Sequence, residues 1–295
     1  MAFPAPPHRY TSDTVPFYGH GRTPPDPAWG AAFTLLADWV GTYYGDTDIF
    51  QRHYPGLRLH MESLVSIAKV NNESGLLTFS SYSDWCPPST GCRCCWDGAG
   101  GQNGPFPLTL NGKNKNSVIV STFYYITQLR IMARHAATLG YAADAARYGG
   151  LATQVAATFQ ATFYDTVKKT YFEPNHDSYC SQYLSPQTII SLADTLGLVP
   201  VADREAVMDN LVDDIALRGW HLDVGIVGVK YLLPTLSRSG HADVAVILAQ
   251  QRTPPSYVYM VEQGATTLWE TWTSTRYEPG MSNHTLGVPS WNHIM

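Results

Sequence analysis

The sequence predicts an all-α protein built from helical hairpins. Apolar residues recur every three or four positions over most of the 295 residues, and this spacing is typical of helices that bury one face. Glycine follows most of these segments, in the position that ends a helix. No run of alternating apolar and polar residues indicates a sheet of any size. The segments therefore predict a solenoid or toroid of helix pairs.

Two helices are expected before residue 70. Residues 28–44 are apolar and aromatic without proline, and Gly45 is placed to end that helix. The next begins near Asp46 and continues to Ala68. We expect an interruption at Pro55, because proline lacks the N–H group that a helix interior needs.

A third and a fourth helix are expected in the middle of the chain. Ser117 is the expected N-cap of the third. Its buried face steps by four and three up to Gly140, through Val118, Thr122, Tyr125, Leu129, Met132, Ala136 and Leu139. The fourth carries one apolar face, made of Tyr148, Ala152, Val155, Phe159 and Phe163. Gly149 and Gly150 in this helix suggest close contact with a neighbour.

Two further hairpins are expected after residue 184. Ser185–Pro186 supplies an N-cap and a first-turn proline, and that helix ends at Gly197. Val207, Leu211 and Ile215 mark the next helix. Residues 224–236 and 242–250 form the last pair. The longest loop, roughly 74–116, is rich in Gly, Cys, Trp and Pro, and long loops in compact domains are usually functional.

Composition excludes several classes of protein. The formal charge of −5 provides no basic stripe for nucleic acid, and no apolar run approaches the length of a membrane helix. Charged residues make up 15%, against about 25% in an average soluble domain. Eight tryptophans and eighteen tyrosines suit stacking on an uncharged ligand such as a sugar, although a large core would look similar.

Cysteine spacing favours disulfides over metal. Four of the five cysteines lie between residues 86 and 95, without the paired spacings of structural zinc sites, so no metal site is expected. The opening residues lack the pattern of a signal peptide. Sequons at Asn72 and Asn283 are compatible with an extracellular or lysosome-like compartment, and the compartment stays open.

The segment around Glu270 carries the strongest chemical signal. Trp269 and Trp272 flank this carboxylate, and Gly264-Ala265-Thr266-Thr267 precedes it. Glycosidases use carboxylates as general acids and bases and aromatic walls for the sugar ring. Alternatively, Glu270 caps a helix or pairs with Arg276, and the tryptophans are core. Composition alone supports both interpretations equally.

The sequence of this segment resembles that of the α-L-rhamnosidases of glycoside hydrolase family 78. The stretch 264–272 carries the resemblance, with Ser282-Asn283-His284 and Gly287. Supporting matches span nearly the whole chain: Trp29-Gly30, Tyr44-Gly45-Asp46, Asp84-Trp85, 225–233 and 251–257.

The resemblance implies a fold and a reaction. The family's catalytic domain is an (α/α)6 six-hairpin toroid that hydrolyses terminal α-L-rhamnosyl bonds with inversion. A rhamnosylated glycan or glycoside would be the substrate, and hydrolysis needs no cofactor. By resemblance, Glu270 is the general base and His284 contacts the sugar. Aromatic walls are implied at Trp29 and Trp85, and Trp269 and Asp84 are further substrate-binding candidates.

The resemblance also implies missing parts. We expect residues 1–295 to form one partial toroid, without the family's earlier helices and its following β-sandwich. The family's general acid belongs to a Cys-Pro-x-Arg-x-Glu-Arg-like segment that has no counterpart here. Asp26, Glu262 and Glu278 are substitutes without a positional argument. An incomplete toroid is expected to expose apolar helix faces and to self-associate.

Alternative interpretations remain open at this point. The chain is either a fragment of a longer enzyme, which we favour, or a short relative that lacks acid catalysis. Such a relative would bind carbohydrate without turnover. A helical scaffold that binds protein is the third reading of the pattern, with the Trp-Glu-Thr-Trp segment as core.

Overall fold

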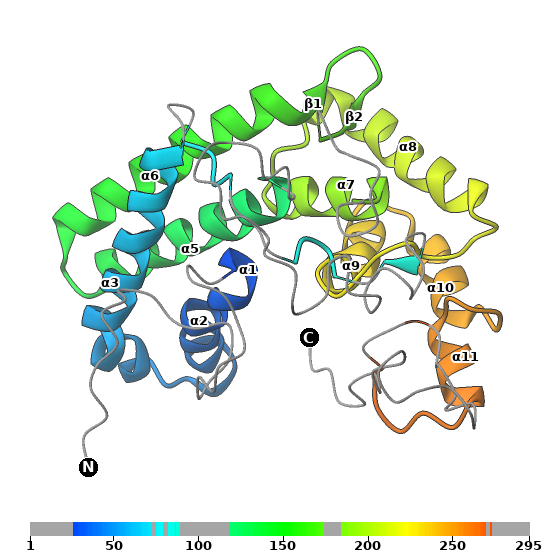
Figure 1. Ribbon diagram of the computed structural model, residues 1–295, viewed down its shortest axis with the longest axis horizontal. Coiled ribbons are helices and arrows are strands. Elements are labelled where there is room, and N and C mark those ends of the chain that lie inside the picture. Colours follow the sequence, from blue (N-terminus) through cyan, green and yellow to red (C-terminus); the bar gives the residue numbers. More distant parts are fainter. Residues whose placement is uncertain are drawn as a thin grey trace, which may run out of the picture. The chain divides into compact units, whose positions relative to one another are not determined.

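A computed structural model describes residues 26–71, 75–78, 82–85, 87–88, 118–173, 184–269 and 272. The chain divides into two compact units. Unit 1 consists of residues 1–81 and 109–162, and unit 2 of residues 82–108 and 163–295. Each unit consists mainly of helices, most of which the sequence pattern predicts; α11 (Tyr257–Glu262) and the short η3 (Val201–Asp203) were not predicted (Figure 1).

Unit 1 is a cluster of helices around a central one. The helices are α1 (Pro27–Gly30), α2 (Ala32–Tyr44), α3 (Asp48–Asn71), α5 (Val118–Thr138) and α6 (Ala142–Phe163), whose last residue belongs to unit 2. Helix α5 packs against α1, α2 and α3. It is buried on nearly all sides in its first half, as expected of a helix surrounded by others.

Polar contacts attach α6 to α3. Arg147 donates to Glu62 at 2.7 Å between Nη2 and Oε2, and the Tyr148 hydroxyl donates to the same carboxylate at 2.8 Å. Tyr54 donates to Asp144 at 2.9 Å. The α6 face predicted from the sequence, from Tyr148 to Phe163, is buried as expected.

The described part of unit 2 contains a small hairpin and five α-helices. Strands β1 (Tyr164–Asp165) and β2 (Thr170–Tyr171) pair antiparallel. The helical elements that follow are α7 (Pro186–Thr195), η3 (Val201–Asp203), α8 (Arg204–Leu217), α9 (Val229–Arg238), α10 (Ala242–Gln250) and α11 (Tyr257–Glu262). Helix α7 packs against α8 and α9, and α9 against α10, so consecutive helices pair as hairpins.

Several predicted helix ends are confirmed. Gly45 ends α2 in the left-handed conformation, with φ at 73°. The Ser185 hydroxyl accepts from the Gln187 amide at 3.0 Å, with Pro186 in the first turn. The α10 range agrees with the expected 242–250. Ser117 lies outside the described residues.

Three expectations were wrong. Helix α3 continues through Pro55, because the flanking Tyr54 and Leu57 are buried in the core and this packing outweighs the lost hydrogen bond. Residues 224–228 are not helical, and α9 begins only at Val229. Close helix contact is absent at Gly150, where a Cβ would meet nothing within 4 Å, whereas a Cβ at Gly149 would lie in ordinary contact with Ala133 at 3.9 Å.

The described helices include none long and apolar enough to cross a membrane. The all-α class is confirmed, since the only described strands are the two-residue pair β1–β2. The prediction of a single partial domain over 1–295 stays a prediction.

Candidate functional site

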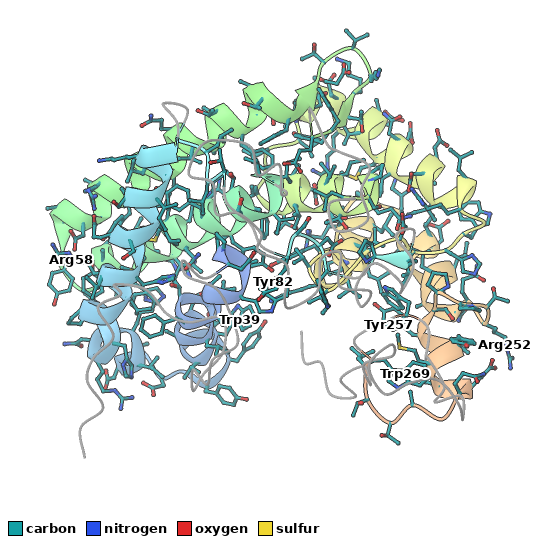
Figure 2. The ribbon with its side chains drawn as sticks, viewed as in Figure 1. Trp39, Arg58, Tyr82, Arg252, Tyr257 and Trp269 are labelled. Carbon is teal, nitrogen blue, oxygen red and sulfur yellow. The ribbon has the colours of Figure 1, made fainter. Side chains whose placement is uncertain are left out.

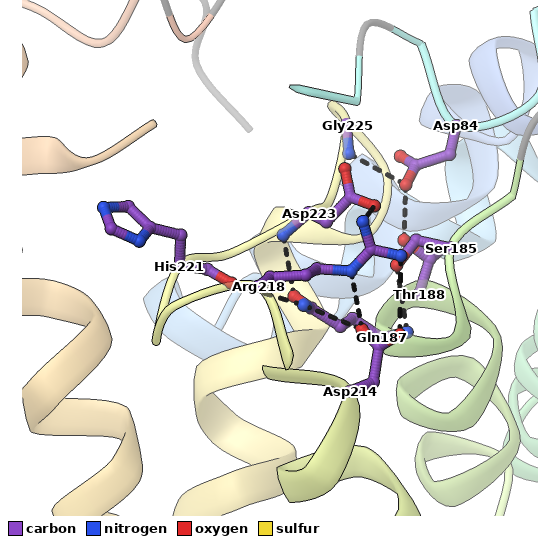
Figure 3. A network of polar contacts seen from close by, with 9 residues as sticks. All are labelled: Asp84, Ser185, Gln187, Thr188, Asp214, Arg218, His221, Asp223 and Gly225. Atoms are coloured by element: carbon purple, nitrogen blue, oxygen red, sulfur yellow. Dashed lines mark hydrogen bonds and ion pairs between the residues drawn. The ribbon is translucent and has the colours of Figure 1, made fainter. Parts of the chain in front are cut away.

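Asp84 is the centre of the polar structure in unit 2. Its side chain lies on the segment 82–85, and the residue is 2% exposed. Oδ2 accepts from the Gly225 amide at 2.8 Å, and Oδ1 accepts from the amides of Val227 and Gly228, each at 2.9 Å. The Thr188 hydroxyl on α7 also donates to Oδ2 (Figure 3). The Asp84 carboxylate thus links residues 82–85 to helix α7 and to residues 225–228.

The environment of Asp84 acts on its pKa in two directions. Burial raises the pKa of the Asp84 carboxyl above its ordinary value, and the four donated hydrogen bonds oppose that rise. Three of the four partners are backbone amides, which can only donate, so the Asp84 carboxyl oxygens act as acceptors toward the loop.

Residues 223–228 form the loop that Asp84 binds, here called the 223–228 loop. The loop approaches the backbone of residues 84–85 too closely for any side chain at Gly225. A Cβ there would lie 2.2 Å from the Trp85 carbonyl oxygen. A Cβ at Gly228 would lie 2.3 Å from the Thr188 hydroxyl. The two glycines are therefore required by close contact.

A second network fixes the start of this loop. Arg218 at the end of α8 pairs with Asp214 at 2.9 Å (Nε to Oδ2) and with Asp223 at 2.7 Å (Nη1 to Oδ2). Gln187 on α7 donates to Asp214 at 3.1 Å and accepts from the Asp223 amide at 2.7 Å. The loop is thus held at Asp223 and at Gly225, as Figure 3 shows. It is also held at Val227 and Gly228.

Trp85 is held by the same loop through its backbone. Its carbonyl oxygen accepts from the Ile226 amide at 2.8 Å. The Trp85 ring is part-exposed and meets Tyr82 edge-on, with centroids 5.9 Å apart. Ser83 between them adopts a φ of 54°, a conformation that non-glycine residues rarely take. Local strain of this kind is common at functional sites.

Val224, next to Asp223 at the start of the loop, binds the side chain of Trp272. The Trp272 indole N–H donates to the Val224 carbonyl oxygen at 2.6 Å, and the ring packs edge-on against Tyr257, with centroids 5.2 Å apart. Trp269 is part-exposed, and Figure 2 labels it with Tyr257 in the part of unit 2 that contains α11. The 223–228 loop therefore joins residues 84–85 to Trp272, which are far apart in sequence.

Trp29 belongs to unit 1. It lies in α1, where the Asp26 carboxylate caps the helix by accepting from the Ala28 amide at 2.8 Å and the Trp29 amide at 3.4 Å. Asp26 is fully buried, and Trp29 is part-exposed. Helix α1 packs on α5, so the tryptophan is carried by a well-fixed turn.

Two predicted residues, Glu270 and His284, lie outside the described residues. The same holds for Glu278 and for all five cysteines. Of the other substitute acids, Asp26 is a helix cap, and Glu262 forms an ion pair with Arg252 on the surface. The roles predicted for Glu270, His284, Trp29, Trp85, Trp269 and Asp84 stay predictions.

Sequence reasoning missed the loop that organises the site. The stretch Gly225-Ile226-Val227-Gly228 is apolar, and we assigned it to a helix. Its two glycines, three residues apart before Val229, were the available signal. Thr188 carried no signal, because a single threonine in a helix is commonplace. Among the described residues, no group of three or more His, Cys, Asp or Glu side chains could hold a metal ion.

Comparison with known proteins shows which family the chain is similar to. Residues 6–295 match a family described as the bacterial α-L-rhamnosidase six-hairpin glycosidase domain. A curated α-L-rhamnosidase from Streptomyces avermitilis is 34% identical over 265 residues, which cover 90% of this chain and 22% of that protein. One from Alteromonas sp. (strain LOR) is 28% identical and is covered to 26% of its length. The chain spans about a quarter of the length of these relatives.

Solved structures give the same result. The α-L-rhamnosidase from Dictyoglumus thermophilum is similar with a TM-score of 0.69 and 31% identity, over 91% of this chain and 26% of that one. The Streptomyces avermitilis enzyme, solved in complex with L-rhamnose, gives 0.66 and 28%, over 90% and 22%. The predicted six-hairpin α/α class is thereby confirmed.

Proposed function

The chain belongs to the six-hairpin glycosidase domain family of bacterial α-L-rhamnosidases, and from this premise we propose that it contributes to hydrolysis of terminal α-L-rhamnosyl bonds. A rhamnosylated glycan or glycoside is the substrate. The observation that carries the proposal is the connection of Trp272 to residues 84–85 through the 223–228 loop. Residues 84–85 and Trp272, which belong to the two segments predicted to bind sugar, therefore lie in one compact unit.

Glu270 is the general base of this proposal. An inverting glycosidase holds a carboxylate on the face opposite the leaving group, where it activates water, with the two carboxyl groups about 6.5–9.5 Å apart. Trp269 and Trp272 neighbour Glu270 in the chain, and Trp272 is anchored. Water is the only co-reactant of the hydrolysis, so the reaction needs no organic cofactor.

The aromatic residues and His284 bind the sugar in this proposal. Rhamnose is a 6-deoxy sugar, and its methyl group and ring face favour apolar contact. Trp85 and Trp269 in unit 2 are part-exposed residues, as is Trp29 in unit 1, and none of the three is fully buried in the core. His284 contributes a hydrogen-bonding group.

Hydrolysis of an aryl α-L-rhamnoside with an activated leaving group tests the proposal. Such a leaving group needs little proton assistance, so the assay does not depend on the general acid. We expect turnover by the purified chain and its loss in Glu270→Gln. The matched control is Glu205→Gln, which removes an exposed carboxylate of α8 in the same unit and should leave turnover unchanged. Wild-type turnover in Glu270→Gln would remove Glu270 as the base.

A second candidate is rhamnose binding without turnover. Two described candidates for the general acid have structural partners: Asp26 caps α1, and Glu262 pairs with Arg252. This alternative predicts that titration calorimetry detects L-rhamnose binding while no aryl rhamnoside is hydrolysed. Binding and hydrolysis together would refute it.

A further inference from the structure

We propose that Asp84 is a positioning residue, which holds Trp85 and the Trp272 end of the Trp-Glu-Thr-Trp segment in place through the 223–228 loop. The inference rests on the proposed function, because it concerns what Asp84 does for a sugar site. It replaces the expectation that Asp84 contacts the sugar directly.

The hydrogen-bonding capacity of Asp84 is already used inside unit 2. An ionised carboxylate offers about four acceptor positions, and Asp84 receives three backbone amides and the Thr188 hydroxyl. With 2% of the residue exposed, a sugar hydroxyl would have to displace one of these donors. Direct binding would thus leave a buried amide or hydroxyl without its acceptor, which is costly.

The loop transmits the position of Asp84 to Trp85. The Ile226 amide donates to the Trp85 carbonyl oxygen between two loop amides that bind the Asp84 carboxylate, those of Gly225 and Val227. These contacts offset the strained φ of Ser83, a conformation that a non-glycine residue keeps only where its surroundings hold it. Without the carboxylate, we expect residues 83–85 to relax and the Trp85 ring to change its direction.

The same loop transmits the position of Asp84 to Trp272. Val224, whose carbonyl oxygen accepts from the Trp272 indole, directly precedes Gly225. A shift of Gly225 away from Asp84 therefore moves the acceptor of the indole N–H group. Asp84 therefore affects the position of Trp272 through two adjacent residues of the loop.

Two variants of the full chain test this inference. Asp84→Asn keeps the side-chain shape but turns an amide donor toward surrounding donors. Thr188→Val removes one donor at nearly constant volume, whereas Thr188→Ser retains the hydroxyl. The control is Asp194→Asn in α7, a buried carboxylate of the same unit that pairs with Arg204 and Arg238 and touches neither tryptophan segment in any described contact.

The first readout is the indole N–H resonances of the ¹⁵N-labelled protein, with Trp85 and Trp272 assigned from their Phe variants. We expect both resonances to shift in Asp84→Asn and, by less, in Thr188→Val. Thr188→Ser and Asp194→Asn should leave both where they are in the wild type. This readout needs neither substrate nor activity.

The second readout is the split between KM and kcat for the aryl rhamnoside, with the dissociation constant of L-rhamnose beside it. Loss of folded protein lowers the apparent kcat and leaves KM unchanged, as expected for Asp194→Asn. Displacement of Trp85 raises KM, and we expect about tenfold for Asp84→Asn, equivalent to about 1.4 kcal/mol.

Several results would overturn the inference. Unshifted indole resonances in Asp84→Asn would refute the positioning role, and unshifted resonances with weakened rhamnose binding would make Asp84 a direct sugar ligand. If Asp84→Asn does not fold, unshifted resonances in Thr188→Val decide against the inference in the same way. A wild-type chain that neither binds nor hydrolyses rhamnosides would refute the proposed function. The indole resonances would still test whether Asp84 positions the two tryptophans, because they need no substrate.

Discussion

Gly225→Ala is the most direct perturbation of the contact between the 223–228 loop and residues 84–85. The added Cβ would lie 2.2 Å from the Trp85 carbonyl oxygen and 2.7 Å from that of Asp84. Both are backbone atoms, and real Cβ contacts essentially never fall below 3.0 Å. The two segments must therefore separate by several tenths of an ångström.

That separation breaks two hydrogen bonds, from the Gly225 amide to Asp84 and from the Ile226 amide to Trp85, each 2.8 Å long. The first has a carboxylate acceptor and is worth about 1.5–3 kcal/mol, and the second about 1 kcal/mol. We expect Gly225→Ala to lower the free energy of unfolding by about 3 kcal/mol, measured by urea denaturation followed through tryptophan fluorescence.

The control for this prediction is Gly150→Ala on α6. A Cβ at Gly150 meets nothing within 4 Å, so alanine should stabilise the helix by about 0.5–1 kcal/mol. A loss below about 1 kcal/mol in Gly225→Ala would refute the reasoning, because it would mean that the loop can move away from residues 84–85 at little cost.

Two further predictions concern buried charge and pH. His60 Nε2 lies 3.0 Å from the Gln128 side-chain oxygen, and burial lowers the pKa of this histidine. Below about pH 6.5, His60 therefore binds a proton in the unfolded chain but stays neutral in the folded chain until the pH reaches its lower folded pKa. The free energy of unfolding should fall as pH decreases from about 6.5 toward the folded pKa. Urea denaturation at several pH values should show a weaker dependence of this free energy on pH in His60→Gln than in the wild type. An equal dependence in both proteins would contradict the argument. Arg218→Met removes the cation beside Asp223, whose side chain is 2% exposed, and should cost about 3 kcal/mol by chemical denaturation. The double variant Arg218→Met/Asp223→Asn should recover part of that loss, and a double variant with no recovery would contradict the assigned pairing.

Helix positions were predictable because their signals are local. The spacing of buried residues along α5 and α6, the cap at Ser185 and the left-handed Gly45 each depend on neighbours within one or two turns of helix. Pro55 shows where local reasoning ends. Its cost is local, but the burial of Tyr54 and Leu57 that outweighs it comes from the tertiary packing.

The candidate site was predictable only in part. Sequence motifs identified the candidate residues Asp84 and Trp85 and the Trp-Glu-Thr-Trp segment, since carboxylates and aromatic residues are characteristic of sugar sites. The partners of Asp84 were not, because Thr188 and Gly225 are separated from it by 104 and 141 residues. An Asp beside a Trp has the same local sequence signature whether it faces a ligand or a loop.

The sequence by itself determined that this protein is helical, that its helices pair as hairpins and that its residues resemble those of α-L-rhamnosidases. Periodicity, caps and motif wording contain that information within short stretches of chain. Only the tertiary structure shows that residues 224–228 are not helical and that three of their amides donate to the Asp84 carboxylate. The physical reason is that a buried carboxylate must be matched by donors, and the chain supplies them from segments that only folding brings together.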